Sequence, residues 1–288
     1  MNASRQARPL RWRKVGLTAA DWVINLLLLA LGLLILAPFA WLVSNSLQPP
    51  LNAFTLPPHW IPTTPNWGNY AQVFQLLPFG TEIVNSIIVT GAIVVGSLVT
   101  STLAAYALAR LNFPGRSALF MMFLSALMIP AQLSVIPVYL LMRYLGLVNT
   151  LPALILPALI QVFGIFLLRQ HFMAVPRELE EAAKIDGAGH WRILRNVIVP
   201  LAGPSLAALA IFTAQQYWND FFWPNILLST PDKMTIPVGL VALQNSHGSG
   251  PPLVIFAAIT IIVAPLLVLF IFTQRRITEG ISFVGVSR

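Results

Sequence analysis

Charged residues in this sequence are gathered into one short stretch. The chain has 17 basic and 9 acidic residues, and nine of these 26 fall within the 32 positions 169–200. The flanking segments are apolar for long enough to cross a bilayer, so the stretch must lie in water. Carboxylates and a lysine at this density can form ion pairs with a partner at the membrane surface. The plain alternative is a well-capped loop that only joins two membrane helices.

The centre of this stretch predicts a short helix. Pro176 suits the first helical turn, and the glutamates that follow it complement the helix dipole. Glu180 and Lys184 stand at i, i+4, and Gly187 suits a left-handed C-cap. These signals predict a helix of about ten residues, roughly 15 Å long. A helix this short is marginal alone in water, so another surface must hold it. A second helix is predicted over 190–199, ended by Pro200.

A second group of polar residues lies inside an apolar segment further along the chain. Gln216, Asn219 and Asp220 have the i, i+3, i+4 spacing of one helix face. A charge at mid-bilayer costs about 2.5–3.5 kcal/mol, and less toward an interface. These side chains therefore either bond to a neighbouring helix or face a watery cavity, and the sequence favours neither.

Several kinds of catalytic or binding site are missing from the sequence. The three lysines are Lys14, Lys184 and Lys233, and none follows a glycine, so there is no phosphate-binding loop of the Gly-x-x-x-x-Gly-Lys type. The chain has no cysteine and its four histidines are scattered, so no metal site is predicted. No Ser-His-Asp set can be placed together. The sequence thus predicts a chain that is not itself an enzyme.

The composition is that of an integral membrane protein. The sequence is 57% hydrophobic and 9% charged, against about 25% charged in soluble domains. A bilayer span takes around 20 apolar helical residues, and lipid offers no partner for an open strand edge. The first apolar run is longer than the core of a signal peptide. The fold class predicted is therefore all-α, with six transmembrane helices. These cover residues 21–45, 84–109, 117–142, 151–172, 203–227 and 253–274.

The distribution of basic residues predicts the orientation. With the N-terminus inside, the inner segments hold 15 lysines and arginines and the outer segments hold 2. The basic N-terminus (1–20), the loop between helices 4 and 5 (173–200) and the tail (275–288) are then cytoplasmic. The excess charge faces lipid headgroups, so no nucleic-acid partner is needed to explain it. The outer segment 46–83 is rich in proline and aromatic residues, and the sequence favours a connector over a docking surface.

Two of the expected spans carry features of helix packing. Ser97, Ser101 and Ala105 place small side chains on one face, which lets membrane helices pack closely. Pro130 and Pro137 interrupt the span 117–142 and are expected to bend it.

The charged stretch resembles a known signature. Glu181-Ala182-Ala183, three residues, Gly187, nine residues and then Val197-Ile198-Val199-Pro200 is similar to the EAA loop of binding-protein-dependent ABC importer permeases. The run from Tyr217 to Pro224 resembles the carbohydrate branch of that family, as does the run from Thr235 to Leu240. The tail resembles the ending of the smaller maltose-type subunit.

This resemblance implies a mechanism and a set of partners. In the family the loop is a coupling helix that docks on a cytoplasmic ATPase, which here implies coupling roles for Glu181, Ala182, Ala183, Asp186 and Gly187. It also implies alternating access through a prokaryotic plasma membrane, with a second homologous permease subunit, an ATPase dimer and an extracytoplasmic sugar-binding protein as partners. No cofactor is expected in this chain, since ATP and Mg²⁺ belong to the ATPase. Gln216, Asn219 and Asp220 remain candidates for the translocation path.

Two other functions are alternatives to this one. A secondary transporter driven by an ion gradient would need ionisable residues in the membrane, and only Asp220 qualifies, with Asp21 and Glu82 near span ends. An intramembrane enzyme or a structural anchor is the third reading, and it has no nucleophile and base to support it.

Overall fold

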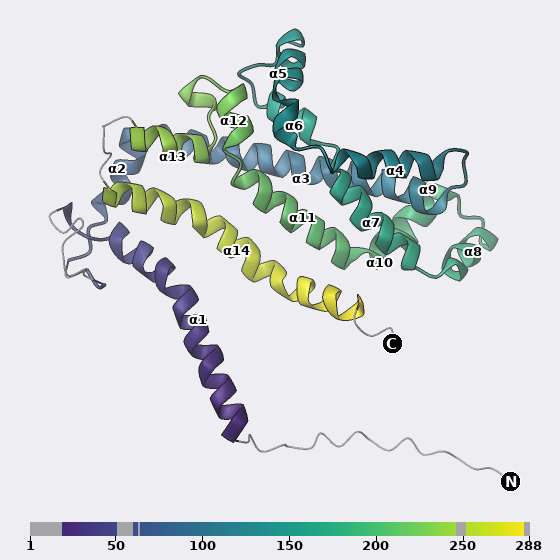
Figure 1. The fold of residues 1–288 in the computed structure, drawn as a ribbon, viewed down its shortest axis with the longest axis horizontal. Coiled ribbons are helices and arrows are strands. Elements are labelled where there is room, and N and C mark those ends of the chain that lie inside the picture. Colours follow the sequence, from purple (N-terminus) through teal and green to yellow (C-terminus); the bar gives the residue numbers. More distant parts are fainter. Residues whose placement is uncertain (1–18, 51–59, 63, 246–251, 285–288) are drawn as a thin grey trace.

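The computed structural model describes residues 19–50, 60–62, 64–245 and 252–284. Every regular element in this part of the chain is a helix, as the apolar composition predicts. The long helices come together at one end of the molecule and diverge from there, and the shorter helices lie at both ends and along one side (Figure 1). The basic residues 1–18 and the end of the tail lie outside the described residues.

Helix α3 (Phe79–Arg110) is the element on which the others pack. Its 32 residues span roughly 48 Å at 1.5 Å per residue. Helices α7 (Val162–Ala174) and α11 (Gly203–Trp218) lie along it (Figure 1). The predicted small face of α3 is confirmed, because Ser97, Ser101 and Ala105 are all completely buried.

A glycine on α7 makes the close approach to this face possible. A β-carbon at Gly164 would lie 2.5 Å from Ser101 Oγ and 2.9 Å from Leu209 Cδ2. We expect Gly164→Ala to destabilise the bundle by about 1–3 kcal/mol, because overpacking forces neighbouring side chains apart. Thermal unfolding in detergent would measure the loss. Gly91→Ala is the matched control, since a β-carbon at Gly91 meets nothing within 4 Å; equal losses in both variants would contradict this account of the packing.

The first and last long helices pack against each other. Helices α1 (Ala19–Ser46) and α14 (Pro252–Val284) are in contact, with Trp41 and Phe256 edge to face at 5.3 Å between ring centroids. Helix α14 also packs on α11 and on the short helix α2 (Gly68–Leu76). Most of the apolar side chains of α1 are exposed, which suits a helix surrounded by lipid.

Two of the expected spans are not straight. Three helical stretches are long and apolar enough to cross a membrane (Asp21–Ser46, Phe79–Arg110 and Pro152–Ala174), and counting two bent pairs as spans gives up to five among the described residues. In the span expected at 117–142, α4 (Arg116–Ala126) stands at 94° to the stretch that follows, which comprises η2 (Ala131–Ser134) and α5 (Val135–Tyr144). The break lies at Pro130, whereas Pro137 is accommodated in the first turn of α5.

The N-terminal end of α3 is tied to a loop far along the chain. Asn85 Nδ2 donates to the carbonyls of Asp232 and Met234, both at 3.0 Å, and Ser86 Oγ accepts from Ile236 N at 3.0 Å. These bonds hold η4 (Pro231–Lys233) and the start of α13 (Ile236–Asn245) at this end. The charged stretch 169–200 meets the opposite end of α3, so α3 links the two ends of the bundle.

Candidate functional site

The predicted short helix is present as α8 (Arg177–Ile185), with Pro176 as its N-cap residue. Gly187 has a φ of 77°, in the left-handed region that favours glycine. Gly187 N donates to Lys184 O at 3.0 Å and Ala188 N donates to Ala183 O at 2.9 Å. This pair of bonds is a Schellman motif, so the predicted glycine C-cap is confirmed.

The prediction that Pro200 ends the second helix is wrong. The chain continues through α9 (His190–Ile193), the π-helical turn η3 (Leu194–Ile198) and α10 (Val199–Leu201), and α11 then leaves at 77° to this stretch. Val199 N bonds five residues back to Leu194 O. Pro200 has no N–H to donate to the preceding turn. The wider π turn before it accommodates this, so the helix continues past Pro200.

Most of the predicted coupling residues lie on the open side of α8 and its C-cap. Glu181, Ala182, Asp186 and Gly187 are exposed, and Ile185 beside them is 87% exposed. Ala183 is half-buried against the hydrophobic core under the loop, which includes Phe172 and Ile193. The helix therefore presents one face of mixed charge and small side chains away from the bundle.

The other face of α8 holds an ion pair that sequence reasoning missed. Glu180 is 7% exposed, and its Oε1 lies 2.8 Å from Nε of Arg110, the last residue of α3. Nη2 of Arg110 also donates to the carbonyl of Phe172 and, at 2.6 Å, to that of Val175. The sequence suggested Lys184 as the partner of Glu180, but the structure pairs Glu180 with Arg110, across the loop. The sequence does contain a signal for this ion pair, because Glu180 and Ala183 share a helix face and Arg110 ends an apolar span.

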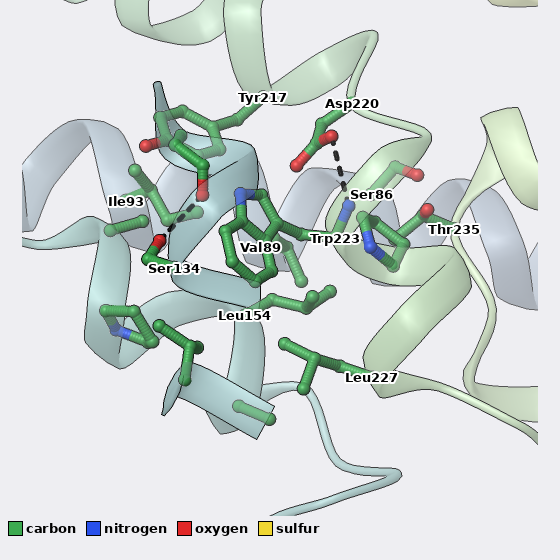
Figure 2. Close-up of a pocket in the computed structure, with 16 residues that line it drawn as sticks. Ser86, Val89, Ile93, Ser134, Leu154, Tyr217, Asp220, Trp223, Leu227 and Thr235 are labelled. Carbon is green, nitrogen blue, oxygen red and sulfur yellow. Dashed lines mark hydrogen bonds between the residues drawn. The ribbon is translucent and has the colours of Figure 1, made fainter. Parts of the chain in front are cut away.

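A cavity of about 240 Å³ lies nearer the other end of the bundle. Three helix breaks border it. Ala131 follows the break at 127–130, Ala158 ends α6 (Pro152–Ala158) just before the break at 159–161, and Asp220 lies in the break at 219–221 between α11 and α12 (Phe222–Leu227). Irregular backbone at membrane depth is tolerated only where protein buries it or where it lines a cavity. Lining residues come from α3, η2, α6, α11 and α12 and from the break between the last two (Figure 2): Ser86, Val89, Ser134, Leu154, Tyr217, Asp220, Trp223 and Leu227.

The three predicted translocation-path residues are not on one helix face. Helix α11 ends at Trp218, and Asp220 Oδ1 accepts from Phe222 N at 3.0 Å and from Trp223 N at 3.4 Å, which caps α12. This carboxylate satisfies the first two N–H groups of α12, which favours the start of a new helix here. Only Asp220 of the three lines the cavity, whereas Gln216 and Asn219 are exposed.

Trp223 and Tyr217, both within the run 217–224 that resembles the carbohydrate branch, also line the cavity, a role that the sequence alone did not predict. Both line it beside Asp220, and Figure 2 shows the Trp223 indole among the lining side chains. A cavity with aromatic walls, a carboxylate and the Ser86 and Ser134 hydroxyls suits a polar ligand with apolar faces. Among the described residues, no three His, Asp or Glu side chains lie where they could hold a metal ion.

Comparisons with known proteins place this architecture in a family. Residues 92–282 match the family model described as binding-protein-dependent transport system inner membrane component. The arabinooligosaccharides transport system permease protein of Halalkalibacterium halodurans is 35% identical over 226 residues, which cover 78% of this chain and 81% of the relative. The trehalose transport system permease protein of Mycobacterium tuberculosis is 34% identical over 250 residues, or 86% of this chain and 90% of the relative.

A solved structure agrees with these relatives. One chain of a bacterial ABC transporter involved in the import of the acidic polysaccharide alginate superposes with a TM-score of 0.78 at 26% identity, over 90% of this chain and 98% of that chain. The match covers most of the chain, so the two proteins share their overall fold. This chain therefore belongs to the family of binding-protein-dependent transport system inner membrane components, the non-catalytic, multi-pass permease subunits of ABC transporters.

Proposed function

We propose that this chain is the permease subunit of an ATP-driven importer for a sugar. The observation that carries the proposal is the agreement among its relatives, which are named as permeases for arabinooligosaccharides, diacetylchitobiose and trehalose at 32–35% identity. Its partners are a second, homologous permease subunit, an ATPase dimer that holds ATP and Mg²⁺, and an extracytoplasmic sugar-binding protein. The chain itself needs no cofactor.

The orientation proposed follows from charge. Arg110, Arg116 and Arg169 lie at the C-terminal end of α3 near the loop 173–200, whereas Lys233 lies at the opposite end beside the partners of Asn85. Under the positive-inside rule the end with α8 is cytoplasmic. The charge distribution of the sequence likewise assigns the segments 1–20 and 275–288 to the cytoplasmic side and the segment 46–83 to the outer side.

Helix α8 is the element that couples this subunit to the ATPase. Glu181, Ala182, Asp186 and Gly187 lie on its open side, and a carboxylate there can pair with a basic group of the ATPase. Ala182 lets the ATPase surface approach closely, and Ala183 seats the helix on the bundle. Closure of the ATPase dimer then moves α8, and the bundle switches the access of its cavity.

The cavity beside Asp220 forms part of the sugar path. A sugar ring has apolar faces that stack on indole and phenol rings, and hydroxyls that donate to carboxylates. Trp223 and Tyr217 supply the rings, and Asp220 keeps its second oxygen for a ligand, since the bonds to α12 use Oδ1. At about 240 Å³ the cavity is below the usual 300–1,000 Å³ range of ligand pockets, which suits a single ring. Gln216 and Asn219, exposed on this subunit, are proposed to face the partner permease across the path.

Reconstitution with the co-purifying subunits tests this function. ATP hydrolysis by the complex in lipid vesicles would be measured with a panel of binding proteins, each loaded with its sugar. We expect one sugar-loaded binding protein to stimulate hydrolysis and to drive uptake into the vesicles. Uptake that needs only an ion gradient and no ATP would contradict the proposal.

A further inference from the structure

We propose that the Arg110–Glu180 ion pair is the mechanical link that carries movement of α8 into the transmembrane bundle. The inference rests on the proposed function, in which α8 is moved by the ATPase. The coupling residues considered so far lie on the open side of α8. Movement of that side has no effect on the cavity unless the inner side of α8 is fastened to a transmembrane helix.

Arg110 is positioned to connect α8 to the transmembrane bundle. Its guanidinium lies where three helices meet: it ends α3, it binds two carbonyls at the C-terminal end of α7, and it pairs with Glu180 of α8. Carbonyls at the C-terminal end of α7 carry the negative end of its dipole, and the carbonyl of Phe172 accepts from Val175 N at 3.2 Å as well as from Arg110. A guanidinium bound there through Nη2 still has Nε to face a carboxylate, and Nε and Glu180 Oε1 form a buried ion pair by distance without the alignment of a hydrogen bond.

Little else holds α8 against the bundle. Its apolar side chains Leu179 and Ile185 are 45% and 87% exposed, and only Glu180 is buried on this helix. Ala183 adds a half-buried methyl group. A buried ion pair is weak evidence for stability, because a hydrophobic pair of the same size is often as stable, but removing one partner leaves the other charge buried and uncompensated. The pair is the buried polar contact between α8 and the end of α3.

The same face of α3 also reaches the second helix of the loop. Tyr106 lies one turn before Arg110, at i−4, and its hydroxyl lies 3.3 Å from His190 Nδ1 at the start of α9. Two successive turns of α3 therefore contact the two helices that flank the Gly187 turn. Because the far end of α3 lines the cavity through Ser86 and Val89, one continuous helix connects the loop to the candidate sugar path.

The test is Glu180→Ala in the reconstituted complex, with the ratio of stimulated to basal ATP hydrolysis as the readout. We expect assembly and basal hydrolysis to persist and the ratio to fall by about 5- to 150-fold, the range of ordinary coupling free energies. Glu178→Ala is the matched control, since it removes an exposed glutamate from the same helix. An unchanged ratio in Glu180→Ala, or equal falls in both variants, would overturn the inference. A wild-type complex without stimulation would instead overturn the proposed function.

A chemical cross-link separates a mechanical role from a structural one. The chain has no cysteine, so Arg110→Cys with Glu180→Cys can be joined by a bifunctional thiol reagent in a cysteine-free complex. We expect the unlinked variant to be uncoupled, the linked one to regain stimulation, and cleavage of a reducible linker to abolish it again. If any variant assembles poorly, the ratio of stimulated to basal ATP hydrolysis is measured on the assembled complex alone. Comparing this ratio before and after linking still tests the mechanical role. Failure of every linker length to restore the ratio would count against the inference.

Discussion

Gly187→Val is expected to uncouple the importer without preventing its assembly. Gly187 has a φ of 77°, which costs a residue with a β-carbon about 1–2 kcal/mol and is worse for a β-branched one. If the backbone at position 187 relaxes to a negative φ, the Schellman bonds from Gly187 N and Ala188 N are broken and the chain after α8 takes another direction. We expect stimulated ATP hydrolysis to fall about tenfold or more in reconstituted vesicles.

Two neighbouring variants make this prediction specific. Gly189→Ala changes a glycine in the same turn whose φ is −77°, and a β-carbon there meets nothing within 4 Å, so it should leave stimulation unchanged. Stimulated ATP hydrolysis in Gly187→Asn should lie between that of the wild type and that of Gly187→Val, since asparagine tolerates the left-handed region. Loss of stimulation in Gly189→Ala as large as in Gly187→Val would show that the backbone conformation is not the cause.

Trp223→Ala is expected to reduce sugar uptake by about 2- to 10-fold, the effect of losing roughly 0.5–1.5 kcal/mol of aromatic contact. Trp223 lines the cavity beside Asp220, and its removal leaves the apolar face of a sugar ring without a stacking partner. The binding protein still docks on the outer side, so ATP hydrolysis should remain stimulated. Uptake and hydrolysis measured on the same vesicles would separate the two effects.

Phe222→Ala is the matched control for this variant. Phe222 is the adjacent aromatic residue, its ring is edge to face with that of Trp223 at 5.4 Å, and it is not among the cavity residues. Both changes remove an aromatic ring from the first turn of α12. If uptake fell equally in both variants, the loss would come from disturbing α12 and not from the cavity.

Apolar length and capping signals were sufficient to predict where most of the long helices lie and where α8 ends. Apolar length predicted the long helices, and the close-packed face of Ser97, Ser101 and Ala105 followed from residue size alone. The end of α8 followed from Gly187, because few other residues adopt a positive φ. These features are local, and each depends on residues a few positions apart.

The features that could not be predicted depend on contacts between distant residues. The partner of Glu180 is 70 positions away, so the local i, i+4 pattern pointed to Lys184 instead. Helix α11 ends at Trp218, and the Asp220 carboxylate binds the first N–H groups of α12. The continuous apolar run 203–227 gives no sign of this break. Pro200 stays within a helical path because a π turn precedes it. The cavity exists only where three separate helix breaks meet.

The side of the membrane on which α8 lies, and what covers it there, is the most direct test of the central claim. A single cysteine replacing Ile185, which is 87% exposed in a chain without cysteines, can be labelled with a membrane-impermeant thiol reagent. We predict labelling only from the cytoplasmic side of membrane vesicles, and protection from labelling when the ATPase subunits are bound. Labelling from the outer side, or equal labelling with and without the ATPase, would contradict the account.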